Sequence, residues 1–260
     1  MEKFRKVLST FIKSGSEITG AVINTSINTT MPGFEGVILG TAVQQIFTKV
    51  GEEINNQLLS PREVKRVGAT ATYIVQKINE ELNRGKELRS DDFFDDNKSN
   101  RSDAEEILEG IFLKAQKEHE EKKLKYYGNL IANICFNETV SKDFANQLIN
   151  IVDKLTYRQL QLIVVYSLNK MQSKSFLRDG KFTDLSGKEI DKISILQDTI
   201  ELYRMSILNC GGEMFLEMSQ INPSKMGLDP LGAWLAKLMN LGEIGNEDYR
   251  EVDKIVMILQ

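Results

Sequence analysis

SDAEEILEGIFLKAQKEHEEKKLKYYGNLIANICF, residues Ser102–Phe136, is the stretch from which we predict the fold of this chain. Its start, Ser102 to Glu105, has the form of a capping box, in which a serine hydroxyl accepts a backbone N–H and a glutamate reaches back. Apolar residues then recur at helical spacing on both sides of a charged centre. No proline interrupts the stretch, so it predicts one helix roughly 50 Å long. We therefore expect an all-α fold, a multi-helix bundle around this one long central helix, residues 102–136.

The composition is that of an ordinary globular protein with a sizeable core. The chain has 260 residues, of which 41% are apolar and 27% charged, and both values are typical of globular domains. Its formal net charge of −4 provides no overall basic field that would attract nucleic acid. Cys135 and Cys210 are far apart and form no CxxC motif. This usage favours a reducing cytosol and predicts two buried thiols rather than a disulfide or a zinc site.

The first residues combine basic side chains with an apolar face at helical spacing. A basic amphipathic helix can lie on an anionic membrane or dock on a partner, and the alternative is that it covers the protein's own core. Lys13 interrupts the apolar run, and no run reaches the roughly 18 residues that span a bilayer. We expect a cytoplasmic protein, or one peripheral to the inner membrane. The candidate membrane or partner contacts are Phe4, Arg5, Lys6, Leu8, Phe11 and Ile12.

Residues 1–59 form an amphipathic, Gly-rich N-terminal segment that differs in texture from the rest. Glycines punctuate small and β-branched residues in ITGAVINTSINTT and GFEGVILGTAVQQIF. Small residues let helices approach closely, both in membranes and in tightly packed pairs. Pro32 and Glu35 divide the segment, so neither half is long enough to span a bilayer alone. Two interpretations stay open: a close-packed hairpin or oligomer contact, and a hairpin that rearranges into a membrane.

Residues 60–155 are expected to form the helical core. Ser60-Pro-Arg-Glu63 combines a hydroxyl cap, a proline at the first helical position and a glutamate at the third, which predicts a helix start. Gly85–Arg101 is acidic and poor in aliphatic residues, so it predicts a loop. Ser141 is expected to cap the helix that follows the central one.

Residues 156–260 are expected to form a winged-helix-like helical module. Thr156-Tyr-Arg-Gln159 is a further capping box, and it opens a helix that is apolar nearly all round and therefore buried. A helix ending in ELYRMSIL, a hairpin near residues 213–228 and LDPLGAWLAKL then follow. Residues 155–242 resemble a winged-helix domain in this order of elements. The resemblance implies a small two-stranded wing.

Two further passages resemble a widespread family of bacterial helical proteins to which no activity is assigned. They are SPREVKRVGATATYIVQKI, residues 60–78, and EHEEKKLKYYGNLIANICF, residues 118–136. The family has a Gly-rich amphipathic start, a capped helix, an acidic loop and a long helix. The resemblance implies a bacterial cytosolic protein and carries over no catalytic residue.

No residue pattern predicts a catalytic or metal site. His119, the only histidine, has no metal-ligating residue three or four positions away, so we expect a structural or solvated side chain. Asp95–Glu106 has the ligand spacing of a calcium loop, but Asn100 replaces its glycine and Ser102 suits a helix cap better. The glycines match no phosphate-binding motif. We expect no enzyme, no cofactor, no metal and no small-molecule substrate.

The C-terminal module leaves two interpretations of function. From Thr156 to Gln260 there are 12 basic and 14 acidic residues, and the expected recognition helix has Asp198 and Glu201 against Arg204. DNA affinity comes mainly from Lys and Arg on phosphates, so this charge disfavours DNA without removing it. We expect a non-catalytic bacterial interaction or regulatory protein with a protein partner or a homo-oligomer. By analogy it suits an effector of a toxin-like or antiphage system; the alternative is a winged-helix transcription regulator.

Overall fold

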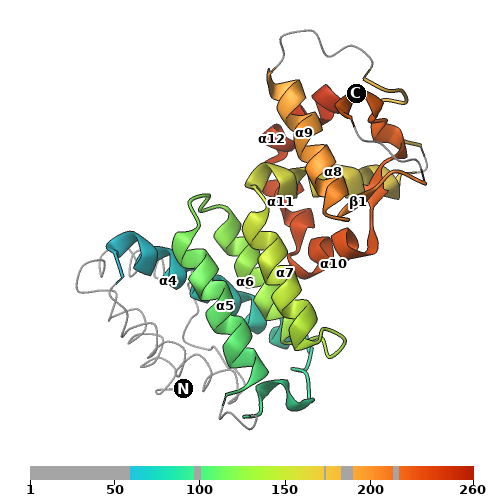
Figure 1. The fold of residues 1–260 in the computed structure, drawn as a ribbon. Helices are drawn as coiled ribbons and strands as arrows, with labels where there is room; N and C mark the ends of the chain where they lie inside the picture. The colour runs from blue at the N-terminus through green and yellow to red at the C-terminus, as the bar shows by residue number, and fades with distance from the viewer. Residues whose placement is uncertain (1–58, 97–100, 173, 183–189, 213–216) are drawn as a thin grey trace. The chain divides into compact units, whose positions relative to one another are not determined.

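The computed structural model describes residues 59–96, 101–172, 174–182, 190–212 and 217–260. These residues belong to two compact units, one ending at Lys154 and one beginning at Leu155. Both units are mostly helical (Figure 1), and in the described part of the chain the sheet consists of two short antiparallel strands. The all-α class predicted from the sequence is confirmed.

In the first unit, helix starts follow the caps that the sequence predicts. At the start of α4 the hydroxyl of Ser60 accepts the N–H of Glu63, and the Glu63 carboxylate accepts the N–H of Ser60 at 2.7 Å. Hydroxyl caps also begin α5 at Ser102 and α7 at Ser141. The elements of this unit are α4 (Pro61–Asn83), η2 (Asp92–Phe94), α5 (Asp103–Lys117), α6 (Lys123–Ile134) and α7 (Lys142–Lys154).

The single long helix predicted for residues 102–136 is wrong at its centre. The chain forms α5 and α6 instead, joined by the turn Glu118–Lys122. The backbone of Glu118 is extended, with φ −68° and ψ 120°, and this ends α5. Apolar periodicity holds within each helix. The periodicity does not reveal that the chain reverses between them, because the reversal depends on contacts with other helices.

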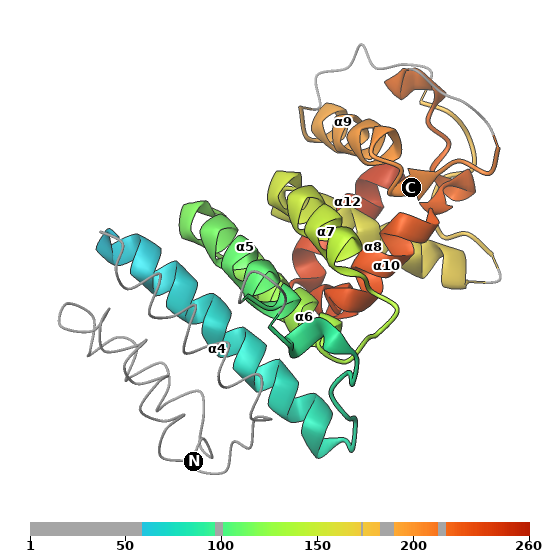
Figure 2. The ribbon, with the colours of Figure 1, turned by 60° about the horizontal axis from the view of Figure 1, so that its bottom comes forward.

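The four α-helices that the structure describes in the first unit run alternately up and down. At one end, Arg66 of α4 donates to the carbonyl of Gln116, the last turn of α5, at 3.4 Å. At the other end, Lys142 at the start of α7 pairs with Asp103 at the start of α5. Because α6 connects these two ends, it runs antiparallel to α5, and Figure 2 shows α4 lying along both. The core between them includes Ile74, Ile78, Ile107, Ile111, Phe112, Leu130, Ile134 and Leu148.

Helices α4 and α6 approach each other closely at Gly128. A Cβ atom at this position would lie 2.5 Å from the Cβ of Tyr73 and 3.1 Å from the backbone nitrogen of Ile74. Gly128→Ala is therefore expected to push the two helices apart. The free energy of unfolding is expected to fall by about 1–2 kcal/mol. Overpacking destabilises the protein, and the better helix propensity of alanine offsets part of this loss.

Urea unfolding followed by circular dichroism measures this loss. Gly110→Ala in α5 is the matched control, because a Cβ there lies 3.9 Å from its nearest neighbour, the Cδ1 of Ile149. That variant is expected to be neutral or slightly stabilising. Equal destabilisation by the two alanines would show that close approach at Gly128 is not the cause.

Helix α8 is the centre of the second unit. Every residue from Leu160 to Tyr166 is buried, as the nearly all-round apolar sequence predicts. The helix contacts α9, α10, α11, α12 and β2. The elements of this unit are α8 (Tyr157–Met171), α9 (Ile190–Arg204), β1 (Leu208–Asn209), η3 (Met218–Gln220), η4 (Pro223–Lys225), β2 (Gly227–Leu228), α10 (Pro230–Leu238), η5 (Leu241–Glu243), α11 (Ile244–Glu247) and α12 (Tyr249–Leu259).

The strands β1 and β2 join α9 to α10 as an antiparallel pair. Leu208 lies opposite Leu228, and Asn209 lies opposite Gly227. The pairing therefore begins before the range 213–228 that the sequence predicts for the hairpin. Gly211 and Gly212 have φ of 65° and 93°, so they turn the chain out of β1 in a conformation that glycine adopts without strain.

Candidate interaction surface

The contact residues predicted at the N-terminus lie outside the residues that the structure describes; they are Phe4, Arg5, Lys6, Leu8, Phe11 and Ile12. Of the other singled-out residues, His119 lies on the α5–α6 turn with its side chain 87% exposed. Burial raises the pKa of the Cys135 thiol to about 12, so near neutral pH it is protonated and not a nucleophile. Cys210 is buried as well.

The calcium-like spacing is occupied by structural contacts where the structure describes it. Ser102 caps α5, and both Asp103 and Glu106 pair with Lys142 of α7. Residues 97–100 of the spacing are outside the described part of the chain. Among the described residues, no three His, Cys, Asp or Glu side chains are close enough together to hold a metal ion.

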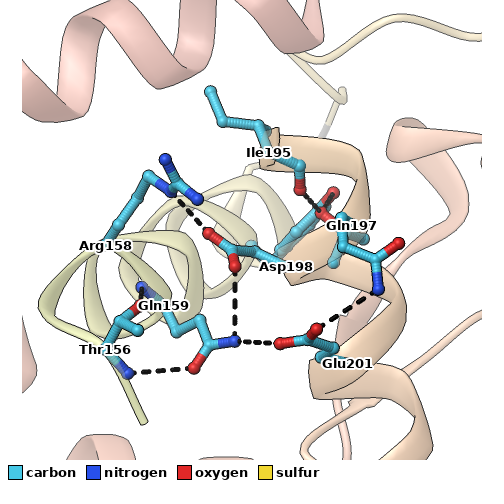
Figure 3. Close-up of polar contacts among 9 residues, drawn as sticks. Thr156, Arg158, Gln159, Ile195, Gln197, Asp198 and Glu201 are labelled. Atoms are coloured by element: carbon cyan, nitrogen blue, oxygen red, sulfur yellow. Dashed lines mark hydrogen bonds and ion pairs between the residues drawn. The ribbon is translucent and has the colours of Figure 1, made fainter. Parts of the chain in front are cut away.

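The second unit contains a polar cluster between α8 and α9, shown in Figure 3. Gln159 of α8 donates to Glu201 at 2.8 Å and to Asp198 at 3.4 Å, and Arg158 donates to Asp198. Asp198 is 6% exposed. Its charge therefore faces α8 rather than solvent, which corrects the use of Asp198 as an argument against DNA binding by α9.

The orientation of Gln159 follows from the capping box of α8. Its side-chain oxygen accepts the backbone N–H of Thr156 at 3.0 Å, and the Thr156 hydroxyl accepts the N–H of Gln159 at 3.2 Å. Since the amide oxygen is used in the cap, the amide nitrogen faces the carboxylates of α9. Further along, the hydroxyls of Tyr166 and Thr199 lie 3.3 Å apart, and Thr199 donates to the Ile195 carbonyl. These contacts fix residues 198–201 of α9 on α8.

Next to the polar cluster, one stripe of α9 is left partly to solvent. We call it the α9 outer face; it consists of Ile190, Ile193, Gln197, Glu201 and Arg204, which lie at helical spacing, and Gln197 donates to Glu201 at 3.2 Å. Ile190 is 77% exposed and Ile193 is 38% exposed. Arg204 is the one cation on this stripe. The outer face therefore has its apolar side chains toward the N-terminal end of α9, beside the exposed Asp191, and Glu201 and Arg204 toward the other end.

The first unit contains a second polar cluster, which the sequence does not predict. The Glu118 carboxylate accepts from Lys123 at 2.5 Å and from the hydroxyl of Tyr127 at 2.6 Å. The side chains of Glu118 and Lys123 are 5% and 2% exposed. We call these three residues the Glu118 cluster. In the sequence Glu118 and Lys123 belong to a run of charges typical of a solvated helix surface, so only the fold distinguishes them.

Two opposing effects act on the pKa of Glu118. Burial alone raises it, whereas hydrogen bonds from Lys123, from Tyr127 and from the Glu120 N–H lower it, and these bonds prevail. The pKa of Glu118 is therefore held below its ordinary value. Burial and the neighbouring Glu118 carboxylate raise the pKa of Tyr127, which stays protonated. An ionised carboxylate with three donors and no open face stabilises the turn and is not available to a substrate.

Arg89 is a further buried charge, in the loop between α4 and α5. Its side chain donates to both carboxylate oxygens of Asp91 and to the carbonyl of Val140 at 3.0 Å. Its guanidinium lies 4.1 Å above the ring of Phe93, and its backbone N–H donates to the Cys135 carbonyl. The hydrogen bonds from Arg89 lower the pKa of Asp91. This network fastens the acidic loop to the end of α6, which is a structural role.

Comparison with protein-family models, curated proteins and solved structures found no match to this chain. In the part of the chain that the structure describes, none of the helices has both the length and the apolar character to cross a bilayer.

Proposed function

We propose that this chain is a non-catalytic interaction protein, and that the α9 outer face is a contact surface for a protein partner. The observation that supports the proposal is the pair of exposed apolar side chains near the start of α9. Asp198 and Glu201 are engaged by α8, while Ile190 and Ile193 are left in water. Exposed apolar side chains beside few charges are typical of the centre of a protein–protein contact.

The engagement of titratable groups in the described part of the chain supports the same proposal. Two of the buried ionised groups, Glu118 and Arg89, are engaged by ion pairs and hydrogen bonds. His119, the one histidine of the chain, is solvated. An acid–base or nucleophilic mechanism needs such groups to face a substrate within hydrogen-bond reach.

A winged-helix regulator is the second candidate. The order α8, α9, β1, β2 and α10 supports it, since a winged helix places its recognition helix before a two-stranded wing. The small number of basic residues on α9 disfavours DNA as the ligand. Helix α9 has two basic residues, Lys192 and Arg204, and specific DNA contacts usually involve several phosphate-neutralising cations. We therefore propose a winged-helix-like module that binds protein.

Ile193→Asp is expected to abolish partner binding, because it places a charge in the apolar part of the α9 outer face. A photo-crosslinking amino acid at position 190, in cells that make the protein, is expected to give a discrete cross-linked species that this variant loses. Met257→Asp on α12 is the matched control, since Met257 is 64% exposed. Both variants should keep the stability of the unaltered protein within about 0.5 kcal/mol. A cross-linked species that survives Ile193→Asp would refute the assignment of this face.

Binding to DNA is expected to be weak and independent of sequence. In a gel-shift selection from a random duplex library at physiological salt, the dissociation constant should be no tighter than about 10⁻⁶ M, the non-specific range. Arg204→Ala should change this dissociation constant little. Enrichment of one sequence with a dissociation constant near 10⁻⁸ M, and its loss in Arg204→Ala, would favour the regulator instead.

A further inference from the structure

The turn between α5 and α6 consists of residues that favour a helix. Glu118–Lys122 contains no glycine or proline, and Glu121 and Lys125 have the i,i+4 charge order that stabilises helices. A helix commonly ends at a glycine, whose backbone adopts the left-handed conformation that terminates it. Local preference and tertiary structure therefore disagree at this turn, a disagreement that is typical of functional sites.

The end of the turn next to α6 is already helical. Lys122 has φ −59° and ψ −28°, and the N–H of Lys123 donates to the carbonyl of Glu120 at 2.8 Å, three residues back. Glu118, with its ψ of 120°, departs from helix, and the N–H of Glu121 donates to the carbonyl of His119 at 3.1 Å, only two residues back. For α5, the turn and α6 to become continuous, the backbone would have to change at Glu118 and in the middle of the turn.

The contacts that hold the turn are possible only while the chain reverses. Glu118 binds Lys123 and Tyr127, which follow it by five and nine residues. In a continuous helix the side chains on one face are three or four residues apart, so neither pair survives there. The third contact, from the N–H of Glu120 at 2.8 Å, is also lost, because in a helix that N–H is directed to a backbone carbonyl.

We propose that the Glu118–Lys122 turn is a latent helix, and that the Glu118 cluster keeps it closed. When the contacts of Glu118 break, α5, the turn and α6 join into one helix from Asp103 to Ile134, about 48 Å long, and α5 leaves α4 and α7. The apolar residues that α5 buries in the bundle oppose this opening. The population of the open form is therefore small while the Glu118 cluster is intact, and it grows when the cluster is weakened.

Spin labels at positions 109 and 133 distinguish the two forms in the full chain, with Cys135 and Cys210 replaced by alanine. In a continuous helix their backbones lie about 36 Å apart, from the rise of 1.5 Å per residue. In the hairpin both positions lie toward the same end of the bundle and are much closer. The protein with an intact cluster should show the short distance. In Glu118→Ala, the population near the long distance should be at least several-fold larger than in the protein with an intact cluster.

Two glycines provide the control. His119→Gly and Lys122→Gly leave Glu118, Lys123 and Tyr127 in place but disfavour a helix through the turn. Added to Glu118→Ala, they should remove the long distance. A folded Glu118→Ala protein with only the short distance would overturn the proposal, as would a long distance that persists with the glycines.

If Glu118→Ala unfolds, Tyr127→Phe decides in the same way, since it keeps the ion pair and loses one hydrogen bond.

Discussion

Glu118→Ala is expected to destabilise the first unit by about 3–5 kcal/mol, the range for removing one partner of a buried ion pair. The substitution leaves Lys123 without its counter-charge at 2% exposure, and it leaves the hydroxyl of Tyr127 without its acceptor. Burying an unpaired ammonium group costs far more than the lost contact itself. Urea unfolding, or hydrogen exchange of the α6 amides, measures the loss.

A double variant separates the ion pair from the packing around it. Glu118→Leu with Lys123→Met removes both charges and keeps most of the volume. Buried ion pairs replaced in this way are often neutral or more stable, so we expect a stability within about 1 kcal/mol of the unaltered protein. If the double variant is as unstable as Glu118→Ala, the unpaired charge is not the cause.

The pH dependence provides a second check, and its sign follows from the pKa. Because the folded state lowers the pKa of Glu118, the carboxylate stabilises the fold fully above the ordinary glutamate pKa. That stabilisation is lost as the pH falls through the lower folded value. The difference between the unaltered protein and Glu118→Ala should therefore be constant near neutral pH and shrink in strongly acidic solution. A difference that grows on acidification would contradict this assignment of charge.

The helix starts can be predicted from the sequence because a cap is a local structure. Ser60, Ser141 and Thr156 each bond to a backbone N–H three residues ahead, so all of the information lies within four positions. The buried character of α8 is predicted for a similar reason, since its residues are apolar all round.

The turn after α5 and the direction of Asp198 cannot be predicted in this way. Glu118 and Lys123 look like any other members of a charged run, and their burial depends on how α4, α5 and α6 pack. Asp198 looks like a solvent-facing acid on a helix until Gln159 and Arg158 of α8 are placed beside it. In both cases the deciding partner lies on another helix, and helical periodicity carries no information about it.

Gly232→Ala is expected to destabilise the second unit by about 3 kcal/mol, at the upper end of overpacking effects. Gly232 is in the first turn of α10, where a Cβ atom would lie 2.1 Å from the carbonyl oxygen of Ile207. That oxygen cannot easily move away. It accepts the N–H of Asp229 at 2.9 Å, and Ile207 itself donates to the carbonyl of Leu202 at the end of α9.

The clash therefore joins three elements: moving Ile207 disturbs the end of α9 and β1, and moving α10 breaks the bond from Asp229. Urea unfolding of the unaltered protein and of Gly232→Ala measures the loss. Gly245→Ala in α11 is the matched control, because a Cβ there meets only Val164, at 3.9 Å, and it should be neutral or slightly stabilising. If Gly232→Ala unfolds at the same urea concentration as Gly245→Ala, α10 can move away from Ile207 without cost, and the Asp229 bond does not hold it.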